Sequence, residues 1–310
     1  MRTKRCLGIG PALTRGCRSS IAVGLLGEAC KRSVTRYTPV PCSSADPEVW
    51  REDDASARAI VAAAWRALMR ILIVAPPKTG NSWLKCLFSS VYGLDWLTSD
   101  RVPGGTTLQA FATWLSSGGF PDNAVFHHHY AHSPQLVDLA RAESIHLATI
   151  LRDPYDMFVS GYFFAQAQAD NDKRLEKQKS SRRDEMAGRA IDDPVVLDYL
   201  AERFDKQLQM GIDWLQSGAS VVVRYEGLVD DPVAALRRAT DQLQPVSDEQ
   251  IRRAVKSCQA DALLSSRKGL RRRIRAATSG DWRNHLSPAH LAIFRERHAA
   301  RIRALGYEVR

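Results

Sequence analysis

The feature that most constrains the fold is a short apolar run that begins at residue 70. Residues 70–75 read RILIVA, and two prolines end the run. An uninterrupted aliphatic segment of this length is typical of a strand in a parallel sheet that is buried on both faces. A turn with one glycine, residues 78–82, follows, and a helical pattern covers residues 83–92. The order of strand, turn and helix predicts the first unit of an α/β protein.

The alternation of strands and helices continues to the end of the chain. Further strands are predicted at 124–130, 145–151 and 220–225, and helices at 134–141, 153–166, 195–216, 232–243, 248–258 and 288–305. Because strands alternate with helices, we expect a three-layer α/β/α domain with a central parallel sheet. This domain is predicted to span residues 69–310.

The net charge of +10 would suit a nucleic-acid-binding protein, but most of it lies in one segment. Residues 1–45 hold eight basic side chains and one acidic one, a net +7, which leaves +3 for the other 265 residues. Residues 1–68 also show no sustained apolar period. We therefore expect residues 1–68 to form a poorly ordered basic leader, either a targeting segment or an upstream mis-start, and we expect no nucleic-acid partner.

The cysteines divide in the same way. Four of the six lie in the leader, and the domain holds only Cys86 and Cys258, neither of which belongs to a CxxC pair. A disulfide or a zinc site in the domain is therefore not expected, and reduced thiols fit a cytoplasmic protein. Since no run of about 18 apolar residues occurs, we expect no transmembrane helix.

The turn after the first strand has the chemistry of a phosphate site. A glycine turn at a helix start aims backbone N–H groups at one point, where the helix dipole adds positive charge. Lys78 adds a full charge, and Thr79, Asn81 and Ser82 add short side-chain donors beside Gly80. The loop is not a Walker A sequence, because asparagine follows the glycine where that pattern has lysine. An ordinary turn with a surface lysine is the alternative.

Four motifs, in a fixed order, extend this interpretation. They are PKTGNSW at 77–83, RDPYDMFVS at 152–160, RYEGL at 224–228 and GDWRNHLS at 280–287. They resemble, in the same order, the PKSGTTW, R-(N/D)-P-x-D-x-x-x-S, RYEDL and GDWKNHFT motifs of the sulfotransferases that use 3′-phosphoadenosine 5′-phosphosulfate (PAPS). The resemblance covers about 70% of the chain. It implies an enzyme on a P-loop-like core that uses PAPS as sulfuryl donor and requires no metal.

The resemblance also implies the donor-binding residues. They are Lys78, Thr79, Gly80, Asn81, Ser82, Trp83, Arg152, Ser160, Tyr225 and Arg275. A guanidinium grips phosphate bidentately, and Ser160 lies about two helical turns beyond Arg152, so both side chains suit the 3′-phosphate. Trp83 is expected near the adenine, with core packing as its alternative. Tyr225 suits the adenosine or, equally, a core position.

One donor element departs from the family pattern R-K-G-x-x-G-D-W. Counting back from Gly280 puts Arg275 at the arginine position, but alanines replace the lysine and glycine. An intact Arg267-Lys268-Gly269 triplet lies eight residues earlier. We favour Arg275, and an insertion that brings in the earlier triplet remains the alternative.

The family places a histidine base at the end of a strand. This chain offers His127, His128, His129 and His132, and the match to the family pattern selects His129. A slip of one residue would select His128 instead. The three consecutive histidines also suggest a metal site, but no HExxH pattern or carboxylate cluster accompanies them. An unperturbed histidine titrates near neutral pH and suits general-base work.

The predicted reaction moves a sulfuryl group from PAPS to a hydroxyl or amine of a small molecule or carbohydrate. His129 deprotonates the acceptor, while Lys78 and the loop amides stabilise the charge on the leaving phosphate. Trp96, Trp114 and Phe120 either line the acceptor pocket or belong to the core. The alternative function is a nucleotide-dependent kinase on the same core.

Overall fold

The computed structural model describes residues 69–98, 107–169, 185–259 and 278–310. These residues belong to one compact unit, Ser56–Arg310. The predicted leader and three residues expected near the donor, Arg267, Lys268 and Arg275, lie outside the described residues. The domain boundary at residue 69 therefore stays a prediction. Among the described helices, none is long and apolar enough to cross a membrane.

The described strands form one parallel sheet in the order β2-β3-β1-β4-β5. The strands are β1 (Arg70–Val74), β2 (Asp95–Trp96), β3 (Ala124–His128), β4 (Ile145–Leu151) and β5 (Val221–Arg224). The apolar run that begins at Arg70 is the central strand, and four of its five residues are buried, as the apolar pattern predicted. The sequence missed β2, because two residues are too few to carry an alternating pattern.

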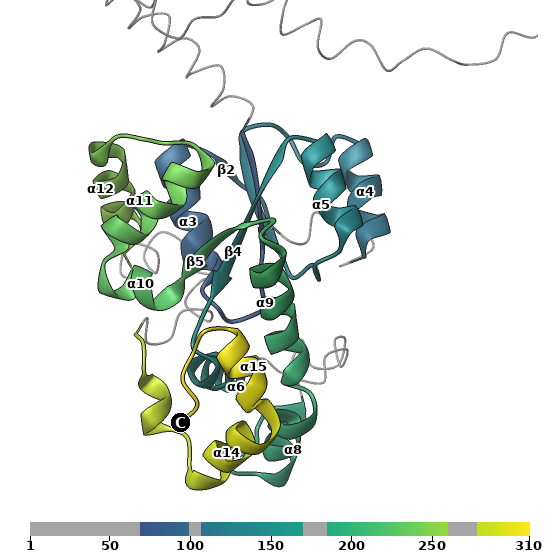
Figure 1. Cartoon of the computed structure of the whole chain (residues 1–310), viewed down its shortest axis with the longest axis vertical. Helices are drawn as coiled ribbons and strands as arrows, with labels where there is room; N and C mark the ends of the chain where they lie inside the picture. The colour runs from purple at the N-terminus through teal and green to yellow at the C-terminus, as the bar shows by residue number, and fades with distance from the viewer. Residues whose placement is uncertain (1–68, 99–106, 170–184, 260–277) are drawn as a thin grey trace, which may run out of the picture. The chain divides into compact units, whose positions relative to one another are not determined.

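Helices cover both faces of this sheet, which confirms the three-layer architecture (Figure 1). Ile71 and Ile73 of β1 face a core built with α3 (Asn81–Tyr92), α10 (Tyr225–Asp230), α11 (Pro232–Leu243) and α12 (Asp248–Ser257). Leu72 and Val74 face the opposite core, built with α4 (Leu108–Ser116), α5 (Pro134–Ala142) and α9 (Asp205–Ser217). The alternation along β1 therefore supplies both cores.

A third core is built from α6 (Pro154–Ala169) and α8 (Pro194–Glu202) together with the C-terminal helices. These are the 3-10 turn η5 (Asp281–Asn284), α14 (Pro288–Ile293), the π-helical turn η6 (Phe294–His298) and α15 (Ala299–Ala304). The single helix predicted at 195–216 is wrong, since α8 ends before Phe204 and α9 begins after it. Phe204 lies in this core, where its ring meets Phe158 and Phe294 edge-on. Hydrophobic periodicity missed the break because both halves are amphipathic.

The structure also corrects the expectation of two separate thiols. Cys86 of α3 and Cys258 at the end of α12 form a disulfide, with their Cα atoms 5.9 Å apart. The two residues are 172 positions apart in the sequence, so no spacing pattern links them. Packing of α12 against α3 brings them together.

Candidate functional site

The four sequence motifs meet at the carboxyl ends of the parallel strands. Val74 pairs with His128, and Leu151 pairs with Arg224, so β1, β3, β4 and β5 end along one edge. The phosphate loop follows β1, and Arg152 follows β4 directly. In open α/β sheets this edge is where ligands bind.

The phosphate loop is shaped by its own side chains. Thr79 Oγ1 and Asn81 Nδ2 each donate a hydrogen bond of 2.9 Å to the carbonyl oxygen of Pro76, and both residues are buried. These two side chains thus hold the turn rather than point outward. Lys78 and Gly80 have positive φ, 71° and 108°, which turns successive peptide groups sharply at the start of α3. Of Thr79 and Asn81, only the backbone N–H groups are therefore left for the predicted contact with a phosphate.

Tyr225 lies directly behind this loop. A Cβ added to Gly80 would come within 2.7 Å of the Tyr225 ring, so only glycine fits at this point. Trp83 meets Tyr225 edge-on, with ring centroids 5.8 Å apart. Burial raises the pKa of the Tyr225 hydroxyl, so it stays protonated at neutral pH. The two aromatic residues therefore pack together beside the loop.

The Lys78 side chain reaches across to α6. Its ammonium nitrogen lies 4.3 Å from the centroid of the Phe164 ring. A cation over an aromatic face is attracted by the ring quadrupole, an effect of about 0.5–2 kcal/mol. The charge of Lys78 is therefore held beside the loop and not in open solvent.

Arg152 is held from several sides. Its guanidinium carbon lies 4.1 Å from the Tyr225 ring centroid, and Nη2 donates to the carbonyl oxygen of Thr278 at 3.0 Å. Nη1 reaches the carbonyl oxygen of Lys78 at 3.5 Å. Its Nε is buried and has no hydrogen-bond partner among the described residues. An anion that accepted from this edge would satisfy it, so the site fits the phosphate that the sequence predicts.

The start of α6 collects three buried or half-buried carboxyl groups, none of which the sequence analysis placed in the site. Asp153 accepts from the Tyr155 N–H at 2.8 Å and so caps the helix. Glu226 accepts from the Asp153 N–H at 2.8 Å, and Asp156 accepts from two N–H groups of the loop that begins η5. Burial, reinforced by the charges of Asp156 and Glu226, raises the pKa of Asp153 to about 6. The sequence signal for these three carboxyl groups was their position inside the motifs at 152–160 and 224–228.

Ser160 lies on α6, two helical turns beyond Arg152, and is half-buried. Ser82 lies in the first turn of α3 and is half-buried too. Both serines therefore lie on helices that begin at the carboxyl ends of the strands.

His129 and His128 differ in their surroundings. β3 ends at His128, earlier than predicted, and His129 is the first residue after the strand. Its Nδ1 lies 2.8 Å from the carbonyl oxygen of Ala75, which can only accept a hydrogen bond. Nδ1 therefore carries the proton, and the lone pair of the neutral ring is on Nε2.

His128 has the opposite arrangement. Its Nδ1 accepts the His129 backbone N–H at 2.9 Å, and burial lowers the pKa of its imidazole. His127 and His128 are buried, whereas His129 is half-buried. His132 lies further along and contacts the Trp214 ring edge-on. Among the described residues, no group of three or more His, Cys, Asp or Glu could hold a metal ion.

Two of the aromatic residues proposed for the acceptor pocket belong to a core. Trp114 and Phe120 are buried, and their rings stack with centroids 5.6 Å apart. Trp96 of β2 instead lies against Lys85, whose ammonium nitrogen is 4.1 Å from the centroid of the Trp96 ring. Lys85 is buried and donates to the carbonyl oxygen of Leu97.

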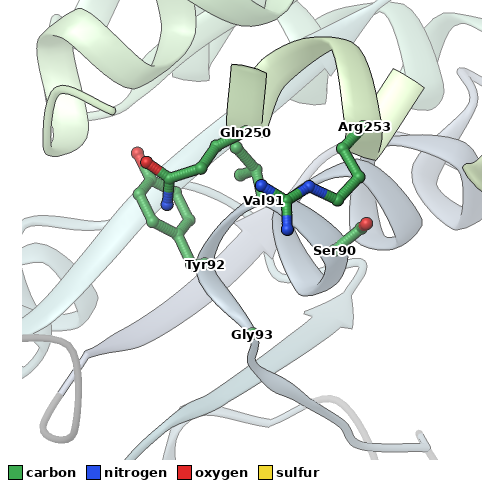
Figure 2. Close-up of a pocket in the computed structure, with 6 residues that line it drawn as sticks. All are labelled: Ser90, Val91, Tyr92, Gly93, Gln250 and Arg253. Carbon is green, nitrogen blue, oxygen red and sulfur yellow. The ribbon is translucent and has the colours of Figure 1, made fainter. Parts of the chain in front are cut away.

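A pocket found in the described part of the chain lies away from this edge. It is lined by Ser90, Val91, Tyr92, Gly93, Gln250 and Arg253, at the C-terminal end of α3 (Figure 2). The phosphate loop is at the other end of the same 12-residue helix, roughly 16 Å away at 1.5 Å per residue. The pocket is therefore too distant to take part in chemistry at the strand ends.

Comparison with known proteins gives a family and a fold. The family model of the sulfotransferase domain matches residues 68–306. The crystal structure of mouse sulfotransferase SULT7A1 complexed with PAP is 16% identical, with a TM-score of 0.52, over 76% of this chain and 84% of that one. A retinol dehydratase in complex with androsterone and inactive cofactor PAP is 12% identical, with a TM-score of 0.50, over 77% of this chain and 82% of that one. Curated protein sequences give no significant match.

Proposed function

We infer that this chain, which belongs to the family of sulfotransferase domains, transfers a sulfuryl group from PAPS to an acceptor. The observation that carries the inference is the Arg152 guanidinium beside the phosphate loop, with its buried Nε unsatisfied among the described residues. Solved proteins of the same fold are complexed with PAP, the 3′,5′-bisphosphate that the donor becomes when it has lost its sulfuryl group.

We propose that two groups of residues divide the donor between them. The backbone N–H groups of 79–82 and the Lys78 ammonium bind the 5′-phosphate and the sulfuryl oxygens. Arg152 and Ser160 bind the 3′-phosphate, and Trp83 with Tyr225 flanks the adenosine. Because Tyr225 stacks on Arg152, it also fixes the plane of the guanidinium. Arg275 stays in the proposal as a further ligand of the 3′-phosphate from outside the described residues.

His129 is the proposed base. Its tautomer, fixed by Ala75, leaves Nε2 able to take the proton of an acceptor hydroxyl or amine. The acceptor atom then bonds to the sulfur, while the bond from sulfur to the 5′-phosphate oxygen breaks. Lys78 and the loop amides stabilise the charge that this oxygen gains. His128 is poorly suited, because its Nδ1 is already an acceptor and its pKa is lowered.

A kinase on the same core is less well supported. In a Walker A loop a lysine follows the glycine and reaches the nucleotide phosphates. Here that position is Asn81, whose amide donates to Pro76 inside the loop. Binding and turnover with PAPS, compared with ATP and magnesium, separate the two functions: phosphoryl transfer from ATP would contradict the sulfotransferase.

The acceptor is proposed to be a hydroxyl or amine of a small molecule or carbohydrate, with no nucleic acid as partner. A screen with sulfur-labelled PAPS against extracts and compound classes identifies it by the product that gains the label. A labelled protein or nucleic acid, with no labelled small product, would contradict this part of the proposal.

We keep the cytoplasm as the proposed location, although Cys86–Cys258 argues against it, because disulfides persist mainly in oxidising compartments. Alkylation of the protein in denaturant, added at the moment of lysis so that buried thiols are also reached, decides the matter. Modification of both Cys86 and Cys258 supports a reducing compartment, and resistance of both to alkylation would contradict the cytoplasm.

A further inference from the structure

Asp156 is a buried carboxylate with unusual partners. It lies in the first turn of α6 and is 2% exposed. Its Oδ2 accepts the Gly280 N–H at 2.6 Å, and its Oδ1 accepts the Trp282 N–H at 2.9 Å. Each oxygen therefore binds one backbone group of a segment more than 120 residues away. A charged acceptor for two amides forms hydrogen bonds stronger than neutral ones.

The segment that Asp156 holds also holds Arg152. The carbonyl oxygen of Thr278, two residues before Gly280, accepts from Arg152 Nη2 at 3.0 Å. Gly280 has a φ of 83°, a left-handed turn that aims its N–H at the carboxylate. Trp282 anchors the same segment, because its ring packs on Tyr155 with centroids 5.0 Å apart. Asp156 thus fixes the backbone that fixes the guanidinium.

The direct distance between Asp156 and Arg152 is informative as well. Asp156 Oδ2 lies 4.0 Å from Arg152 Nη2, the outer limit of an ion pair. Because amides already occupy both oxygens, Asp156 balances the buried positive charge without a bidentate pair. The guanidinium edge that carries Nε remains unsatisfied among the described residues. A donor phosphate would not have to displace a carboxylate.

We propose that Asp156 is a positioning residue for the donor's 3′-phosphate: through the 278–282 segment it orients Arg152 toward that phosphate. The inference rests on the proposed function, since it assumes that the donor carries a 3′-phosphate. It differs from a purely structural role, in which Asp156 would only join two parts of the third core. A structural role would weaken every ligand alike or lower only the melting temperature.

The test uses the full chain and two nucleotides that differ only in the 3′-phosphate, PAP and adenosine 5′-phosphate. Asp156→Asn keeps the shape but loses the charge and one acceptor. The affinity for PAP should fall about tenfold or more, the loss expected for a charged hydrogen bond, while that for adenosine 5′-phosphate changes little. Asp193→Asn is the matched control, because Asp193 also accepts a backbone N–H, from Val195 at 2.8 Å in α8.

A double-mutant cycle with Arg152→Ala makes the test specific. If Asp156 acts through Arg152, Asp156→Asn should change PAP affinity no further once Arg152 is absent. Equal losses in both backgrounds, or unchanged preference for PAP in Asp156→Asn, would overturn the proposal. If the wild type does not bind PAP more tightly than adenosine 5′-phosphate, both the proposed function and the role of Asp156 are contradicted. Should Asp156→Asn not fold, Asp156→Glu, which retains the charge but displaces it, goes through the same cycle with the same criteria.

Discussion

The two sides of the strand-end site are built differently. On the side of β4 and β5, the side chains of Arg152 and Asp156 bond to distant backbone groups, and the backbone N–H of Asp153 donates to the distant Glu226 carboxylate. All three hydrogen bonds join residues more than 70 positions apart. On the side of β3, the His129 N–H donates to His128 Nδ1, and His129 Nδ1 bonds to the carbonyl oxygen of Ala75 at the end of β1. The first side therefore depends on loops and helices far along the chain, and the second on the register of β3 against β1. A substitution on the β3 side should disturb chemistry without disturbing donor binding.

The largest expected effect tests that separation. His129→Ala should lower turnover by about 10²–10⁴, because it removes the general base, while PAP affinity stays nearly unchanged. Steady-state rates and calorimetric PAP binding measure the two quantities. His128→Ala is the control with a neighbouring ring of the same type. If His128→Ala is inactive and His129→Ala is active, the assignment of the base is wrong by one residue.

Lys78→Ala should have the next largest effect, on the donor side. Turnover should fall by about 10²–10³, as loss of one donor to developing negative charge does, and PAPS binding should weaken less. Lys206→Ala removes a lysine from an exposed position of α9 and serves as the control for net charge. Near-normal turnover of Lys78→Ala would refute the role of the phosphate loop.

The disulfide offers a test of stability rather than chemistry. Closing a loop of 172 residues restricts the unfolded chain, so Cys86→Ser should lower the free energy of unfolding by about 3–5 kcal/mol. Denaturant titration of wild type with and without reductant gives the reference. Because Cys86 lies about one helical turn beyond Ser82 and its side chain bonds to Cys258 after α12, PAP affinity of the folded variant should change little. Equal stability of oxidised and reduced wild type would mean that the bond does not form in solution.

The smallest effect concerns Asp153, whose pKa is raised from 3.8 to about 6 by burial. A raised carboxyl pKa means that the folded state binds the proton more tightly than the unfolded state. Ionisation of Asp153 therefore lowers the free energy of unfolding. This loss develops as the pH rises from about 4 through 6, and it persists at higher pH. Asp153→Asn, a residue that the family motif allows, removes this cost, which is at most about 3 kcal/mol.

The variant should melt several degrees above wild type at pH 8 and close to it at pH 4. Asp231→Asn, at the cap of α11, is the control, because Asp231 also accepts a backbone N–H of its helix but is exposed to solvent. A difference between Asp153→Asn and wild type that is the same at both pH values would contradict the raised pKa.

Much of the fold followed from local sequence. The aliphatic run of β1, the glycine turn and α3 lie within 23 residues, so their order and burial could be predicted without any distant contact. The same holds for the motifs, because each is short, and three of the four begin at or shortly after the end of a strand. β2 and the break at Phe204 were missed, since each involves too few residues to change the apolar periodicity from which strands and helices are predicted.

Tertiary structure decided what depends on residues distant in the sequence. Only the packing of α12 on α3 brings Cys86 to Cys258, and only the return of 278–282 to α6 gives Asp156 its two amides. The tautomer of His129 likewise depends on Ala75, 54 residues away in the sequence and directly after β1, whose carbonyl oxygen binds Nδ1. Sequence by itself determined the order of elements and the residue types at the strand ends, because these are local properties. Which side chains are buried together, and which nitrogen or oxygen each presents, depends on contacts that form only when the sheet and its covering helices have assembled.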